Sequence, residues 1–419
     1  MEKLKIGLIG FGTVGTGVYK SIQQFNDIEI VKIAVKNINK PRSVELPEGI
    51  LTDNPYEIVN NPSIDVVVEL MGCVEPTWDY IKTAIENGKH IVTANKELLA
   101  KKGEELFKLS EEHNCVVLYE AAIAGGIPII MPIKTIMAGN KIHKIQAILN
   151  GTTNYILTKM DTDGASYEDV LKEAQELGYA ETDPTGDVEG FDAAYKITTL
   201  ATIAFNSRTK FEDVYREGIT KIRKEDMKKA NELGYKIKLI ASATIDDNNN
   251  ADVRVHPMLV SKKTMLAHIN YVTNAVAISG HPIGDILLSG PGAGEFPTAS
   301  SVMGDILSIA REWKTTNYLL PMMRCHHHSI SNPVKIDDTY NKYYLSITAP
   351  NAIGVIAKIG TICANKNISL SRILQSEISN NNTAEITVIT EKCLEKSVKE
   401  FISELDNCEV NSLIRVMEG

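Results

Sequence analysis

The chain has 419 residues, which is enough for two or three domains with hydrophobic cores of their own. Its composition is ordinary for a globular protein, with 43% hydrophobic and 23% charged residues. The formal net charge is −9, from 44 Lys and Arg against 53 Asp and Glu, and no basic stripe runs along the chain. This balance argues against a nucleic-acid-binding surface.

Neither a membrane segment nor a disulfide framework is expected. The longest apolar run, residues 121–133, is too short to span a bilayer and is interrupted by glycine and proline. The start of the chain shows no signal-peptide pattern, so we expect a cytoplasmic protein. The six cysteines are scattered and form no C-x-x-C pair, so we expect reduced thiols.

A strand, a glycine-rich turn and a helix open the chain. Residues 4–10 form a short apolar run, and Gly10, Gly12 and Gly15 follow in the spacing G-x-G-x-x-G. Glycines at this spacing allow a tight turn, a close backbone approach to a pyrophosphate, and close packing of the helix on the sheet. The helix would point its N-terminus at the phosphates. We therefore predict a dinucleotide site, with an ordinary strand–helix turn as the alternative.

The second strand, residues 29–35, bears on which dinucleotide binds. An acidic residue normally follows this strand and holds the ribose 2′-hydroxyl of NAD. This chain has Lys36 at that place, with Lys40 and Arg42 close behind. A cation suits a 2′-phosphate, so NADP is favoured over NAD. The alternative is that Lys36 is an ordinary surface lysine.

The rest of the first domain alternates between apolar strands and helical patterns. Strands are expected at 64–70, 90–94 and 115–121, and helices at 76–87 and 96–113. This alternation predicts an α/β domain over residues 1–133, a doubly wound parallel sheet of Rossmann type. Ligands bind beyond the carboxyl ends of such strands. Lys96 follows one of these ends, so it is either a ligand group or a surface charge at a helix start.

The pattern changes to that of an α+β domain over residues 134–325. Its first strand turns at Asn150, and we expect Thr152 or Thr153 to cap the helix that follows. Longer strands are expected at 238–245, 251–260 and 274–280, and a helix at 298–313.

The stretch 178–196, GYAETDPTGDVEGFDAAYK, places five carboxylates just before an apolar helix. Asp192 and Lys196 are four residues apart on that helix, so they share one face. Burying a carboxylate and an ammonium on an apolar helix is costly unless they pair or serve a purpose. The stretch is therefore either a functional site or an exposed helix start with a surface ion pair.

Three other motifs have both a functional and an ordinary interpretation. Glu120 precedes a glycine loop whose carbonyls could hold a hard cation, although an ordinary turn is the commoner meaning of this pattern. The glycines at 290–294 form either an anion nest or a close-packed turn. Residues 325–328, CHHH, lack the spaced partner ligands of a metal site, so we expect no metal there.

After a connector at 326–342, residues 343–419 form a small unit of their own. The predicted order of strands and helices is β-α-β-β-α-β, which is the ferredoxin-like arrangement.

Six motifs, in order, resemble those of homoserine dehydrogenases of the long form, which end in an ACT domain. The motifs are GLIGFGTVGTGV (7–18), TANKELLA (93–100), YEAAIAGGIPII (119–130), LNGTTNYIL (149–157), GYAETDPTGDVEGFDAAYKI (178–197) and GPGAGEFPTASSVMGD (290–305). The resemblance covers essentially the whole chain. It implies that L-homoserine and L-aspartate 4-semialdehyde are interconverted with NAD(P)H, toward threonine, methionine and isoleucine. It also implies a homodimer or homotetramer.

Carried onto this sequence, the resemblance makes Lys196 the catalytic lysine and Lys96 a second active-site lysine. The implied substrate-binding acids are Glu181, Asp187 and Asp192. Besides the glycine turn and Lys36, the implied cofactor site includes Phe11, Thr13, Val14, Thr93, Lys96, Gly178 and Gly294. A structural sodium ion is implied at Glu120 and the carbonyls of Ile123, Gly125 and Ile127.

The C-terminal unit departs from the ACT pattern Asp-x-Pro-Gly-Val, because Asn351 and Ile353 replace the aspartate and the proline. Threonine is the effector that the resemblance implies, and this departure weakens that expectation. Two competing interpretations are a dehydrogenase for a related amino acid and a non-catalytic amino-acid sensor. The ordered motifs argue against the first, and intact Lys96, Asp192 and Lys196 argue against the second.

Overall fold

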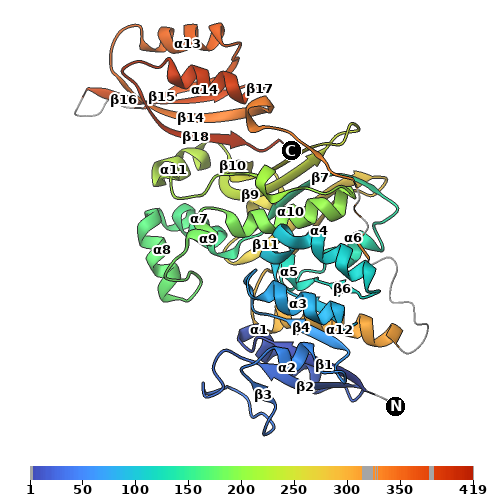
Figure 1. Ribbon diagram of the computed structural model, residues 1–419. Coiled ribbons are helices and arrows are strands. Elements are labelled where there is room, and N and C mark those ends of the chain that lie inside the picture. Colours follow the sequence, from blue (N-terminus) through green and yellow to red (C-terminus); the bar gives the residue numbers. More distant parts are fainter. Residues whose placement is uncertain (1–2, 314–323, 326, 328, 377–381, 419) are drawn as a thin grey trace.

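The computed structural model describes residues 3–313, 324–325, 327, 329–376 and 382–418. Figure 1 shows three units that follow one another along the molecule: the N-terminal sheet, a central mixed α/β unit and a C-terminal unit. Within the described residues, no helix is long and apolar enough to cross a membrane. The six cysteines are free, as their spacing predicts.

The N-terminal sheet is parallel, and its described strands lie in the order β3-β2-β1-β4-β5-β6. The strands are β1 (Leu4–Ile9), β2 (Ile28–Ala34), β3 (Leu51–Thr52), β4 (Val66–Glu69), β5 (His90–Thr93) and β6 (Val117–Leu118). This is the predicted doubly wound sheet. The strand order reverses between β1 and β4, and such a switch point opens a ligand crevice at the carboxyl ends of the strands.

One helix of the N-terminal unit comes from much later in the chain. The early helices are α1 (Thr13–Ile22), α2 (Tyr56–Val59), α3 (Thr77–Glu86) and α4 (Lys96–Glu112). Helix α12 (Glu295–Trp313) packs against α1, and its buried residues Val302 and Ile306 share a core with Leu4 and Leu8. The close approach needs Gly17, because a Cβ there would lie 2.6 Å from the Glu295 carbonyl oxygen. The sequence pattern placed everything from residue 134 to 325 in the second domain, so it did not predict that α12 packs on the first.

The central unit is an antiparallel sheet in the order β12-β11-β7-β9-β10, covered by helices. Its strands are β7 (Lys141–Ile148), β8 (Tyr215–Arg216), β9 (Tyr235–Ile245), β10 (Asn250–Ser261), β11 (Thr273–His281) and β12 (Gly284–Pro291). Its helices are α5 (Ala121–Ala124), α6 (Ile130–Lys134), α7 (Gly151–Asp163), α8 (Tyr167–Glu176), α9 (Thr185–Val188), α10 (Phe191–Phe205) and α11 (Lys224–Glu232).

Helix α10 lies at the centre of the molecule, and its sequence explains why. It packs on β7, β9 and β10 on one side and on α4 of the N-terminal unit on the other. Most of its 15 residues are buried, which agrees with apolar or small side chains on nearly every face. Any charged group on this helix is therefore placed between the two units.

The C-terminal unit has the predicted ferredoxin-like order, with strands arranged β18-β14-β16-β15. Its main elements are β14 (Tyr340–Pro350), α13 (Val355–Asn365), β15 (Leu370–Gln375), β16 (Thr383–Thr390), α14 (Glu395–Ser403) and β18 (Glu409–Val416). Two short strands, β13 (Asn332–Pro333) and β17 (Cys393–Leu394), lie at its borders. Strand β18 also pairs in parallel with β10, through Met258 with Arg415 and Leu259 with Val416. The central and C-terminal sheets are therefore continuous.

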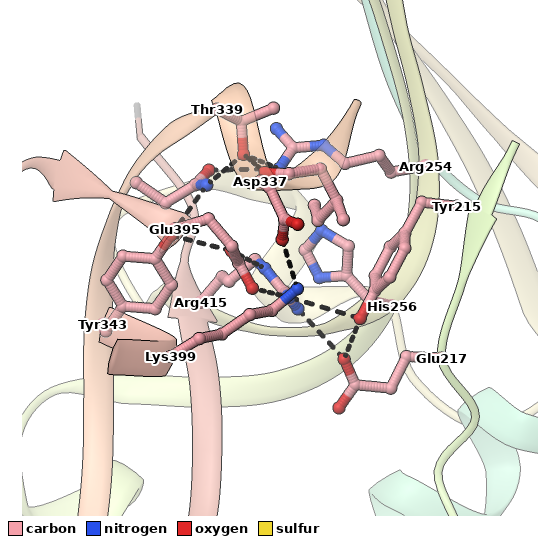
Figure 2. A network of polar contacts seen from close by, with 12 residues as sticks. Tyr215, Glu217, Arg254, His256, Asp337, Thr339, Tyr343, Glu395, Lys399 and Arg415 are labelled. Carbon is pink, nitrogen blue, oxygen red and sulfur yellow. Dashed lines mark hydrogen bonds and ion pairs between the residues drawn. The ribbon is translucent and has the colours of Figure 1, made fainter. Parts of the chain in front are cut away.

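A buried ion-pair network reinforces this junction (Figure 2). Arg415 forms a two-pronged pair with Glu395, with Nε–Oε2 at 2.8 Å and Nη2–Oε1 at 2.5 Å. Its third nitrogen reaches Glu217 of the central unit, with Nη1–Oε2 at 3.0 Å. Tyr343 donates its hydroxyl to Glu395 at 2.7 Å, and Tyr215 donates to Glu217 at 3.2 Å. Buried charges that are hydrogen-bonded in this way fix the relative orientation of the two units. Breaking one pair would leave the partner charge buried without a counter-charge.

Candidate active site

The glycine turn after β1 has the geometry that its sequence predicts. Gly10 has φ +99° and lies so close to Leu70 that a Cβ would be 2.8 Å from its backbone. A Cβ on Gly15 would be 2.5 Å from the Gly10 carbonyl oxygen, so the helix packs tightly on the turn. Gly12 faces open space and no side chain caps α1. The free N–H groups at this helix start are suited to a phosphate.

Among the cations that follow β2, Arg42 contacts this turn. Its Nη1 donates to the Phe11 carbonyl at 3.0 Å and its Nη2 donates to the Asn37 carbonyl at 2.8 Å. The guanidinium lies 5.9 Å from the centre of the Phe11 ring. Lys36, the residue that the sequence pattern singles out, is exposed on the adjoining loop. The structure therefore places one fixed cation, Arg42, beside the predicted cofactor site.

The carboxyl ends of β4 and β5 are held together by a buried acid. Glu69 accepts the backbone N–H of Met71 at 2.6 Å and the Thr93 hydroxyl at 2.6 Å. Burial raises the pKa of Glu69 above its ordinary value. Thr93 is itself buried and uses its hydroxyl for this contact, so its predicted place in the cofactor pocket is a supporting one. Asn95 then caps α4 by accepting the Leu98 N–H, which places Lys96 at the helix start.

Two lysines share one carboxylate between the N-terminal and central units. In the first turn of α10, Asp192 Oδ2 lies 2.6 Å from Nζ of Lys196, one turn further along. The other oxygen, Oδ1, lies 2.6 Å from Nζ of Lys96 at the start of α4. Lys196 also donates to the Leu149 carbonyl at 2.7 Å. Its side chain is 11% exposed against 42% for Lys96, so Lys196 is the more desolvated of the two.

This arrangement shifts the three groups in different directions. Burial acts to raise the pKa of Asp192, but the two ammonium groups outweigh it and hold that pKa below its ordinary value. The Asp192 carboxylate raises the pKa of Lys96, so Lys96 stays charged. Burial lowers the pKa of Lys196, Lys96 adds to this effect and Asp192 opposes it. A lysine with a lowered pKa can exchange a proton nearer to neutral pH.

Asn150 joins the acids of the stretch 178–196 to each other. Its Nδ2 donates to Asp187 Oδ1 at 2.6 Å and to Asp192 Oδ2 at 2.9 Å. The same side chain caps α7, accepting the Thr153 N–H at 2.8 Å. The expectation that Thr152 or Thr153 caps this helix was therefore wrong. The helix begins at Gly151, directly after the turn, so Asn150 occupies the N-cap position. Asparagine caps a helix at least as well as threonine does.

Two cavities meet at the paired lysines. One of about 410 Å³ extends toward Asn150, Tyr179 and Asp187 in the central unit. Another of about 250 Å³ extends toward Val14 and Gly72, beside the glycine turn. Residues that line both cavities are Lys96, Lys196, Gly292 and Ala293. The site can therefore hold a nicotinamide from one side and a small substrate from the other.

The structure brings together most of the predicted site residues. The larger cavity is lined by Lys96, Gly178, Asp187, Asp192, Lys196 and Gly294. Phe11 and Thr13 belong to the glycine turn and the start of α1. Glu181 is exposed, and the described lining of the larger cavity does not include it. Its role stays a prediction.

Asn150 and Asn274 are among the lining residues that the sequence did not reveal. Asn150 was predicted only as a turn residue, although its motif LNGTTNYIL was noted. Asn274 on β11 is 1% exposed and lines the larger cavity. Its Oδ1 has no hydrogen-bond partner among the described residues. An asparagine inside a strand gives no local signal, because only the fold shows that it faces a cavity.

The contacts of Glu120 do not fit the implied sodium site. Its carboxylate accepts the backbone N–H groups of Ile129 at 2.5 Å, Ile130 at 2.8 Å and Met131 at 2.7 Å. The Gly125 carbonyl accepts the Ser301 hydroxyl at 2.6 Å. Three N–H groups directed at one carboxylate anchor the start of α6 and leave it poorly placed to bind a cation.

The CHHH motif can be examined only in part, because His326 and His328 lie outside the described residues. Cys325 Sγ lies 2.9 Å from the Tyr119 hydroxyl and 2.9 Å from Lys134 Nζ.

Comparisons with known proteins cover nearly the whole chain. The family models that match are homoserine dehydrogenase, NAD binding domain, at 10–120, homoserine dehydrogenase at 128–307, and the ACT domain at 343–410. A homoserine dehydrogenase of Synechocystis sp. is 41% identical over 431 residues, covering 99% of each chain. One of Bacillus subtilis is 37% identical over 424 residues, covering 98% of this chain and 96% of its own.

Solved structures agree. The crystal structure of a homoserine dehydrogenase from Thiobacillus denitrificans has a TM-score of 0.93 and 38% identity, covering 100% of this chain and 99% of its own. A hyperthermophilic archaeal homoserine dehydrogenase in complex with NADPH has a TM-score of 0.63 and 26% identity, covering 74% of this chain and 98% of its own.

Proposed function

The chain belongs to the homoserine dehydrogenase family of NAD(P)-dependent oxidoreductases, and we propose that Lys196 is its general acid and base. The observation that carries this assignment is the Lys96–Asp192–Lys196 cluster, which lies where the two cavities meet. The bound nicotinamide supplies or accepts the hydride. The protein's own groups then have to bind the substrate and move one proton.

Lys196 suits the proton transfer in both directions. When aldehyde is reduced, negative charge develops on its oxygen, and the Lys196 ammonium can stabilise that charge and donate a proton. When homoserine is oxidised, the neutral amine has to accept the hydroxyl proton. Burial, which lowers the pKa of Lys196, makes that neutral form accessible at lower pH.

The substrate is an amino acid, so both of its charged ends need partners. We assign its ammonium to Asp187, whose carboxylate lines the larger cavity, with Glu181 as a further predicted contact. We assign its carboxylate to Lys96, which stays charged because Asp192 raises its pKa. In this assignment Asp192 mainly holds both lysines in place, and its contact with the substrate is secondary.

Replacing Lys196 by methionine tests the proton-transfer role. Methionine keeps the apolar stem and removes the ammonium, so the turnover number should fall by about 10²–10⁴-fold. NADPH affinity, measured by fluorescence titration, should stay close to that of the unchanged protein. Lys172→Met, on the exposed side of α8, is the matched control and should keep normal turnover. Near-normal turnover of Lys196→Met would remove Lys196 from the role.

We also propose a preference for NADP over NAD, carried mainly by Arg42. Its guanidinium is fixed over the glycine turn by hydrogen bonds to two carbonyls, whereas Lys36 is exposed on the adjoining loop. A fixed, planar guanidinium can donate two parallel hydrogen bonds to two oxygens of a phosphate.

The Arg42→Ala variant tests this preference. Hydrogen bonds to a charged group contribute about 10–100-fold in binding, so KM for NADPH should rise by about that factor. KM for NADH, which has no 2′-phosphate, should change little. Initial rates with both cofactors measure the effect, and Lys36→Ala should change KM for NADPH less. Equal effects of Arg42→Ala on both cofactors would contradict the assignment.

Threonine inhibition through the ACT domain is a further proposal. The turn before α13 exposes Asn351 and Ile353, the two positions that depart from the usual pattern, and Gly354 keeps the left-handed φ of +92° that the turn needs. The glycine conformation that this turn needs is therefore present although two side chains differ. Initial rates should fall across a millimolar titration with threonine and not with alanine; unchanged rates with threonine would count against it.

Three other expectations stay predictions: the oligomeric state, the biosynthetic pathways and the sodium ion. A homodimer or homotetramer would be checked by light scattering of the full chain. A role in threonine, methionine and isoleucine biosynthesis would be checked by genetic complementation of a strain lacking the enzyme. The sodium ion would be checked by replacing sodium with potassium in the assay.

A further inference from the structure

We propose that Asn150 is a positioning residue that holds the Asp187 carboxylate beside that of Asp192 and keeps it available for the substrate's ammonium. The inference rests on the proposed function, in which Asp187 binds that ammonium. Asn150 is not among the residues assigned so far to the cofactor, the substrate or the proton transfer.

The orientation of the Asn150 amide is fixed by the helix that it caps. Its Oδ1 accepts the Thr153 backbone N–H at 2.8 Å and the Thr153 hydroxyl at 2.9 Å. A backbone N–H can only donate, so the atom facing Thr153 is the oxygen. The NH₂ group therefore faces the two carboxylates, and each of its two protons has one acceptor.

The two carboxylates need such a donor because they share one small space. Asp187 lies 2.6 Å and Asp192 lies 2.9 Å from the same nitrogen of Asn150. Like charges this close disfavour ionisation of at least one of the pair. Asp192 is compensated by direct pairs with Lys96 and Lys196, both at 2.6 Å. Asp187 has no ion pair of its own within 4 Å among the described residues, so its negative charge is the less stabilised of the two.

Several groups act on Asp187, and they oppose one another. Burial raises the pKa of Asp187, and the neighbouring Asp192 charge raises it further. The N–H of Asn150 is the largest opposing effect, with smaller contributions from Thr152 and Lys196. Lys96 also lies within electrostatic reach. Removing the Asn150 donor should therefore leave Asp187 protonated over a wider pH range, and a protonated carboxyl binds an ammonium poorly.

Asn150→Ser separates this role from helix capping. Serine caps a helix as well as asparagine does, so α7 and the folded state should be retained. Serine is too short to donate to both carboxylates. The acidic limb of kcat/KM for homoserine should move to higher pH by about one unit, so KM on the acidic side of that limb should rise by up to about tenfold. At higher pH, where Asp187 ionises without help, KM should return toward that of the unchanged protein.

Asn150→Asp provides a second variant of nearly identical shape. It keeps a capping oxygen but replaces the two donors by a third carboxylate, so the same limb should move further than in Asn150→Ser. A purely structural role would lower the melting temperature and activity without moving the pH limb. An acidic limb at the unchanged position in both folded variants would overturn the inference.

Asp187→Asn distinguishes this inference from the function on which it rests. If Asp187 binds the ammonium, Asp187→Asn should raise KM for homoserine at every pH above the acidic limb, where the unchanged protein has the carboxylate. If it does so while Asn150→Ser leaves the limb in place, only the role of Asn150 fails. If Asp187→Asn leaves KM unchanged, the assignment of the ammonium to Asp187 fails, and the role of Asn150 fails with it.

Discussion

The ion pairs that Asp192 makes with two lysines are the interaction on which the site depends. One pair lies within α10, to Lys196, and the other reaches across to Lys96 on α4. A carboxylate buried on an apolar helix is unfavourable without such partners. With them, the same contact joins the N-terminal and central units and sets the charge of both lysines. Binding and proton transfer are thus organised around a single carboxylate.

The fold explains why this carboxylate can sit between two units. Helix α10 is apolar enough to be enclosed by the central sheet and by α4 at once. The chain also returns to the N-terminal unit through α12, which packs on α1. The two units are therefore tied together on both sides of the cofactor crevice. The C-terminal unit is attached to the central unit by β18 and the Arg415 network (Figure 2).

Much of this could be predicted from the sequence, because the signals are local. The glycine turn, the alternating strands and helices, and the spacing of Asp192 and Lys196 all depend on residues a few positions apart. The contacts of Arg42, Asn150 and Asn274 depend on tertiary packing and left no such signal. The same limit explains why α12 was grouped with the central domain and why the contacts of Glu120 could not be foreseen. Its carboxylate is engaged by N–H groups nine to eleven residues further along the chain.

We propose that Asp192 sets the proton affinity of Lys196. This proposal is tested most directly by the pH dependence of aldehyde reduction in Asp192→Asn, with Asp183→Asn on the exposed loop as the control. Reduction needs the Lys196 ammonium, so its rate falls as pH rises through the pKa of Lys196. Asparagine removes the main charge that raises this pKa. The basic limb should move to lower pH in Asp192→Asn alone, and a limb that stays in place or moves to higher pH would show that Asp192 does not set this pKa.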